Sequence, residues 1–179
     1  MSKKLWYTWE SMRRDVNVLC REIVLDKFDP QVIVGLSRGG LVPGVMMSHW
    51  FQKPFKPIKA SMRDFADEDD AWEDYYPRKS DEKILIVDDI CDSGKTFSRI
   101  FNKIKQRKEA TKQGGASVVY EDGLPVTELR DDIDVRFASL WWNNECNFEP
   151  HYYAQDIAKD STNTWIHFCW ESPYNLDVV

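Results

Sequence analysis

The chain has 179 residues, of which 42% are hydrophobic and 13% aromatic, a composition typical of a globular protein with a sizeable core. Its net charge of -6, without a block of lysine or arginine, argues against a nucleic-acid partner. No apolar run approaches the roughly 20 residues of a membrane span, and the N-terminal residues lack the apolar stretch of a secretory signal. We therefore expect a cytoplasmic protein without a membrane partner.

The cysteines and histidines show no spacing typical of metal ligands. The cysteines are Cys20, Cys91, Cys146 and Cys169. We expect four reduced thiols and no zinc site.

The first part of the chain shows helix and strand patterns in turn. Apolar residues recur at helical spacing over 9–23, and Thr8 can cap that helix. The apolar run 32–36 predicts a buried strand, and the turn 37–40 leads into a short helix. A brief strand is expected around Ile58.

The strongest strand pattern is the continuous apolar run 84–87, which predicts a parallel strand buried on both faces. A helix is expected from about 96 to 112, before a pair of glycines. Shorter patterns predict further strands over 118–120, 135–142 and 165–168. This alternation predicts an α/β fold with a central, mostly parallel sheet flanked by helices. Without a repeat or a linker, we expect a single domain over residues 1–179.

Two adjacent carboxylates stand at the carboxyl end of the run 84–87. These are Asp88 and Asp89, and a short loop containing Gly94 then enters the next helix. Ligands of open α/β sheets bind beyond the carboxyl ends of strands, and backbone N–H groups at a helix N-terminus bind phosphate. A Walker A loop would need a glycine where Asp89 stands, which excludes an ATP-binding P-loop. The segment predicts a phosphate site of another kind.

Residues 84–96 resemble the PRPP-binding signature of type I phosphoribosyltransferases. That signature has four hydrophobic residues, two acids, a variable pair and Asp-(Thr/Ser)-Gly-x-Thr. Residues 37–40 resemble the family's pyrophosphate loop. The opening helix, the run 35–44 and the segment 164–171 are similar to xanthine-guanine and, more loosely, hypoxanthine-guanine members. The resemblance implies the type I phosphoribosyltransferase fold, with a mobile lid at about 61–83 and a small C-terminal hood.

The resemblance also implies a role for each part of these segments. Asp88 and Asp89 would bind the ribose hydroxyls, stabilise developing positive charge and hold Mg²⁺. The 5-phosphate would lie on Asp92, Ser93, Gly94, Lys95 and Thr96. The departing pyrophosphate would lie on Ser37, Arg38, Gly39 and Gly40. Asp92 is also the candidate for taking a proton from the base, although a loop aspartate could instead cap the helix.

The base would lie on the late segment. By resemblance, Trp165 stacks on the purine and Ile166 contacts it through its backbone, although Trp165 could instead belong to the core. Asn143 occupies the position where purine enzymes carry a lysine that reads the 6-oxo group. An amide can donate to an oxo group or accept from an amine, so base preference stays open.

Two segments differ from the resemblance. The acidic stretch 63–83 is unusual for a lid over a polyanion; it could help to bind Mg²⁺ or be a solvated loop. Residues 109–133 look like an insertion before the next strand.

The predicted function is Mg²⁺-dependent transfer of ribose 5-phosphate from PRPP to guanine, xanthine or hypoxanthine, with release of pyrophosphate, in nucleotide salvage. The alternatives are a PRPP- or nucleotide-sensing regulatory protein of the same fold, or transfer to a different base. The acid pair, Asp92 and Arg38 are all present, which favours catalysis over a sensor that has lost one of them. The family implies a homodimer or homotetramer.

Overall fold

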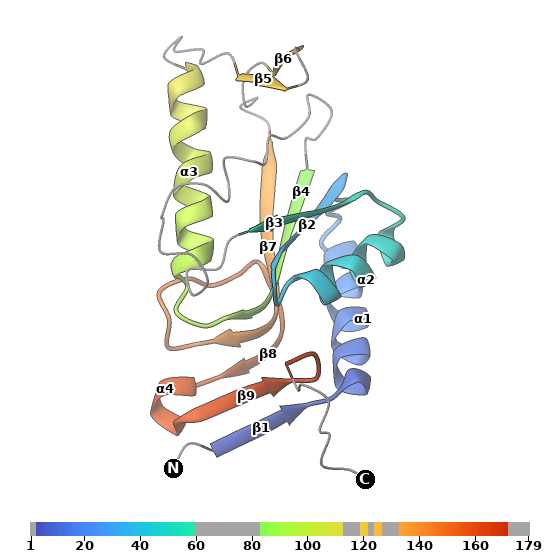
Figure 1. Ribbon diagram of the computed structural model, residues 1–179, viewed down its shortest axis with the longest axis vertical. Coiled ribbons are helices and arrows are strands. Elements are labelled where there is room, and N and C mark those ends of the chain that lie inside the picture. The colour runs from blue at the N-terminus through green and yellow to red at the C-terminus, as the bar shows by residue number, and fades with distance from the viewer. Residues whose placement is uncertain (1–2, 60–82, 113–118, 122–123, 127–132, 172–179) are drawn as a thin grey trace.

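The computed structural model describes residues 3–59, 83–112, 119–121, 124–126 and 133–171 (Figure 1). Almost all of the predicted lid at 61–83 and most of the possible insertion at 109–133 lie outside these residues. The described elements are β1 (Lys3–Tyr7), α1 (Trp9–Leu25), β2 (Val32–Ser37), α2 (Leu41–Phe51), β3 (Phe55–Lys59), β4 (Lys83–Cys91), α3 (Lys95–Lys112), β5 (Val119–Glu121), β6 (Leu124–Val126), β7 (Asp134–Asn143), β8 (Tyr152–Ile157), α4 (Lys159–Thr162) and β9 (Thr164–Phe168).

The central sheet has five strands in the order β3-β2-β4-β7-β8, and all of its neighbouring strands are parallel. This confirms the α/β class and the mostly parallel sheet. β4 is longer than its apolar run predicted, because its pairing with β7 continues to Cys91 opposite Trp142. Asp88 and Asp89 therefore lie within the last part of the strand.

Helices cover both faces of the sheet, with α1 and α2 on one side and α3 on the other (Figure 1). Successive residues of β4 pack alternately into the two hydrophobic cores on either side of the sheet. Leu85 belongs to the core under α1 and α2, whereas Ile84 and Ile86 belong to the core under α3. This two-sided burial explains why the run is continuous rather than alternating. As predicted, Thr8 caps α1, because its hydroxyl accepts a hydrogen bond from the backbone N–H of Ser11 at 3.1 Å.

A second, two-stranded sheet lies beyond the end of the central sheet, where β1 pairs in parallel with β9 (Figure 1). We call this pair, together with α4, the hood. The sequence predicted β9 but not β1, so the hood contains an N-terminal strand as well as C-terminal elements. Tyr7 ties the hood to the core, because its hydroxyl donates to the buried Asp15 carboxylate at 2.7 Å.

The edge strand β8 and the short elements β6 and α4 also had no clear sequence signal. β8 is only partly buried after Tyr152 and lacks both a continuous and an alternating apolar pattern. No helix in the described ranges is long and apolar enough to span a membrane.

Candidate active site

A cavity of about 710 Å³ lies between the carboxyl ends of the central strands and the hood. β2 and β4 are neighbours, so the loops that follow them open into the same space. All the residues that the sequence assigned to the site line this cavity, except Gly40 and Asn143. The fold thus brings together, around one cavity, residues between 36 and 171 that are far apart in the chain.

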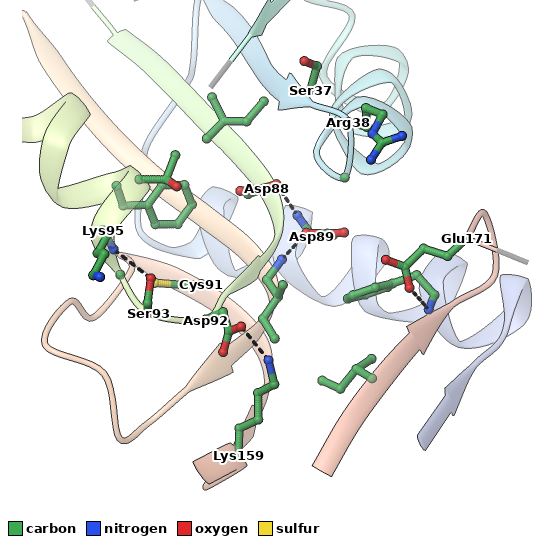
Figure 2. Close-up of a pocket in the computed structure, with 18 of the residues that line it drawn as sticks. Ser37, Arg38, Asp88, Asp89, Cys91, Asp92, Ser93, Lys95, Lys159 and Glu171 are labelled. Carbon is green, nitrogen blue, oxygen red and sulfur yellow. Dashed lines mark hydrogen bonds and ion pairs between the residues drawn. The ribbon is translucent and has the colours of Figure 1, made fainter. Parts of the chain in front are cut away.

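The loop after β2 approaches the acid pair without side chains in between. The peptide bond between Ser37 and Arg38 is cis, and the N–H of Gly40 donates to the Leu36 carbonyl at 2.8 Å. A Cβ at Gly39 would overlap the carboxyl of Asp89. Glycine at this position therefore lets the backbone lie directly against the acid pair. Arg38 is exposed at the cavity wall (Figure 2).

The two acids are half-buried, and each folds back on the backbone that follows it. Asp88 accepts from the N–H of Asp89 at 2.9 Å, and Asp89 accepts from the N–H of Ile90 at 2.8 Å (Figure 2). Burial, and then the charge of Asp89, raises the pKa of Asp88 above its usual range. Burial also raises the pKa of Asp89 to about 6, and the charge of Glu171 adds to this increase. Such a pair suits a ligand that donates hydroxyl protons or brings positive charge.

The loop after β4 forms a cradle at the start of α3. Gly94 has a φ of +72°, a conformation that favours glycine, and a Cβ there would lie 2.7 Å from Cβ of Phe148. The Ser93 hydroxyl lies 3.5 Å from the backbone nitrogen of Lys95, the first residue of α3. An 18-residue helix that begins at the cavity directs its free N–H groups toward an anion.

The opposite wall belongs to the hood. Trp165 and Ile166, adjacent residues of β9, both line the cavity, but Trp165 is 40% exposed whereas Ile166 is buried and also belongs to the core under α1 and α2. The alternation along β9 keeps the indole partly exposed at the cavity, where an aromatic ring suits a flat ligand.

Two charged cavity residues were missed by the sequence analysis. Lys159 lies between the two walls: its Nζ is 2.5 Å from the carboxylate of Asp92 and 5.1 Å from the ring centroid of Trp165 (Figure 2). Glu171 lies on the hood side and accepts from the N–H of Phe168 at 3.1 Å. Lys159 had no signal in the sequence, because it belongs to no motif and lies in a helix of only four residues. Glu171 stood at the end of a segment used for the family resemblance, which could have pointed to it.

Asn143 lies behind the cavity wall, is 2% exposed and has both ends of its amide engaged. Its Nδ2 donates to the backbone carbonyl of Asp92 at 3.1 Å, and its Oδ1 accepts from the backbone N–H of Lys159 at 3.0 Å. The structure therefore connects Asn143 to two cavity residues and does not bring its side chain to the cavity itself.

Within the described residues, no group of three or more histidine, cysteine or acidic side chains could hold a metal by itself. Asp88 and Asp89 nevertheless supply hard oxygen ligands beside the phosphate cradle. Mg²⁺ is commonly bound through one or two carboxylates together with substrate phosphates. The donor set therefore fits an Mg²⁺ ion that arrives with a phosphorylated ligand.

Together, the parallel sheet, the acid pair and the cradle at the start of α3 define an α/β protein whose strand ends fit a phosphorylated ligand that carries hydroxyl groups. The family model for the phosphoribosyl transferase domain matches residues 6–176. The chain belongs to this family, and it is accordingly a transferase.

Individual proteins agree with this assignment. The chain is 28% identical to a xanthine-guanine phosphoribosyltransferase of Vibrio parahaemolyticus over 178 residues, which cover 96% of this chain and 91% of that protein. It is 24% identical to one of Idiomarina loihiensis over 175 residues, covering 95% and 88%. The crystal structure of a purine phosphoribosyltransferase from Pyrococcus horikoshii shares the fold, with a TM-score of 0.66, 23% identity and coverage of 96% and 95%.

Proposed function

We propose that the chain transfers ribose 5-phosphate from PRPP to a 6-oxopurine base, namely guanine, xanthine or hypoxanthine, and releases pyrophosphate. The observation that carries this proposal is that the acid pair, the phosphate cradle and the partly exposed indole of Trp165 line one cavity. The names of the two curated relatives support the same class of base.

The proposed reaction uses the two walls for different parts of the substrates. The cradle Asp92–Thr96 binds the 5-phosphate, and residues 37–40 bind the pyrophosphate group. The ribose hydroxyls donate to Asp88 and Asp89, whose negative charge stabilises the positive charge that develops on the sugar. The base lies against Trp165, at stacking distance from the indole.

The chemical step exchanges one bond at the ribose C1 for another. The bond from C1 to the pyrophosphate oxygen breaks, and a bond from C1 to the base nitrogen N9 forms. The departing pyrophosphate takes the electron pair of the broken bond. The base loses the proton on N7 to the carboxylate of Asp92, which lines the cavity between cradle and hood.

The proposed cofactor is Mg²⁺. The ion would be held by the PRPP oxygens with Asp88 and Asp89, and it would neutralise the charge that the leaving pyrophosphate acquires.

The test is an assay of the purified protein with PRPP, Mg²⁺ and one base at a time. Guanine, xanthine, hypoxanthine, adenine and uracil form the panel, and both pyrophosphate and nucleotide are quantified. We expect turnover with at least one 6-oxopurine, and Asp92→Ala should lower it at least about tenfold. Turnover with adenine or uracil alone would overturn the base assignment. PRPP binding without turnover on any base would favour a regulatory protein instead.

A further inference from the structure

We propose that Lys159 is the residue that selects the base, by donating a hydrogen bond to the oxygen at purine position 6 while Asp92 accepts the neighbouring N7–H. This inference rests on the proposed function, and it assigns a specificity role to a residue outside the family's motifs.

The position of Lys159 suits this role. Its side chain is only 13% exposed, yet it lines the cavity. The ammonium ion-pairs with the Asp92 carboxylate and lies above the ring of Trp165, with 5.1 Å from Nζ to the ring centroid. A base that stacks on this face would take the space above the ring, so the flexible Lys159 side chain would have to move its ammonium to the edge of the base, beside Asp92. Figure 2 shows the Lys159 side chain extending from α4 to Asp92.

The pair is chemically complementary to one edge of a 6-oxopurine. Guanine presents N7 and the 6-oxygen next to each other on one edge, whereas adenine presents N7 beside an amino group that donates. An ammonium has three N–H donors and no acceptor, and an ionised carboxylate only accepts. Lys159 can therefore satisfy an oxygen at position 6, whereas an amino group there would meet another donor.

Asn143 explains how the lysine reaches this place. By resemblance to the purine phosphoribosyltransferases, Asn143 occupies the position of the lysine that binds the 6-oxo group in those enzymes. Its amide instead bonds the carbonyl of Asp92 and the backbone N–H of Lys159, so it fixes both members of the pair.

The experiment compares Lys159→Met with the wild-type protein and with Lys53→Met as the matched control. Lys53 is also ion-paired, with Asp29 at 3.0 Å, but it lies after α2 and does not line the cavity. We expect Lys159→Met to lower kcat/KM for the preferred 6-oxopurine roughly 10- to 100-fold, as for loss of a charged hydrogen bond in a specific site. The KM for PRPP should change less than about threefold, and Lys53→Met should match the wild type.

Discrimination between oxo and amino bases is the sharper measurement. The ratio of kcat/KM for hypoxanthine to that for adenine should fall at least about tenfold in Lys159→Met. Lys159→Gln, whose amide can donate or accept, should bring the two bases still closer together. A ratio equal to that of the wild type in both variants would overturn the assignment.

A nucleotide-binding experiment distinguishes a failure of this inference from a failure of the proposed function. IMP and AMP are titrated into the wild type and both variants, with tryptophan fluorescence as the signal. A preference for IMP that Lys159→Met loses would support the role of Lys159 even if no base turned over, in which case only the proposed reaction fails. An unchanged preference in a protein that turns over 6-oxopurines would overturn the role of Lys159 and leave the reaction standing. If Lys159→Met does not fold, Lys159→Gln decides both experiments.

Discussion

The two walls of the cavity are built in different ways. The sheet wall comes from two short segments, residues 37–39 and 88–96, each at the carboxyl end of a strand of the central sheet. The hood wall is assembled from side chains of α4, β9 and the residues just after β9, and β9 pairs with β1 from the other end of the chain. The acid pair and the cradle of the sheet wall are therefore encoded by residues close in the chain, whereas the hood wall depends on tertiary contacts.

The largest effect is expected where the two loops of the sheet wall touch. In Gly39→Ala the new Cβ would overlap the Asp89 carboxyl, so the loop or the acid must move. Because a displacement of about 1 Å can cost about 100-fold in rate, we expect at least that loss of kcat/KM. Steady-state kinetics measures it, and circular dichroism should show an unchanged fold. Activity within threefold of wild type would show that the contact is not needed.

In the same wall, we expect one substitution at Asp89 to lower activity and to raise stability. Asp89→Asn should lower kcat at least about tenfold, because a neutral amide stabilises developing positive charge poorly. The same change should raise the melting temperature at pH 8 by a few degrees, because it removes a charge that burial disfavours. Asp29→Asn, at an exposed carboxyl, is the control for both measurements.

The pH dependence of stability follows from the same carboxyl. The pKa of Asp89 is about 6 in the folded protein and about 4 in an unfolded chain. Between these values the folded state holds more protons, so the free energy of unfolding should fall as pH rises through pH 4–6. Urea unfolding at several pH values should show a shallower fall in Asp89→Asn. An identical slope in both proteins would contradict the raised pKa.

On the hood wall, Trp165→Ala should weaken the binding of the base but not that of PRPP. Loss of a stacked aromatic ring costs about 1–3 kcal/mol per base, so we expect the KM for the base to rise roughly 5- to 150-fold. The KM for PRPP should stay within threefold. Trp50→Ala, which removes an exposed tryptophan at the end of α2, is the control. A loss of stability without a change in KM would place Trp165 among structural residues.

The smallest effect on activity is expected where the hood joins the core. Tyr7→Phe leaves the buried Asp15 carboxylate short of a hydrogen bond of 2.7 Å, which should lower the free energy of unfolding by about 1–3 kcal/mol. Turnover should remain within about twofold. Urea unfolding measures the loss, with Tyr153→Phe as the control. Equal stability in the two variants would show that the Tyr7 hydroxyl does not anchor the hood.

The sequence by itself determined the local features of the sheet wall. The continuous apolar run of β4 predicted its burial on both faces, and Thr8 predicted the start of α1. The order of acids, glycine and hydroxyl residues predicted a phosphate cradle at the start of α3. These features follow from hydrophobic periodicity and from backbone preferences, which act between residues close in the chain.

Only the tertiary structure decided the hood wall. β1 pairs with β9 although they lie at opposite ends of the chain, and Lys159 meets Asp92 across 67 positions. Asn143, assigned to the base by resemblance, lies behind the wall because its amide is bonded to Asp92 and Lys159. No spacing in the sequence encodes such contacts. They form only when the parallel sheet places the ends of β4 and β7 side by side and the hood closes over them.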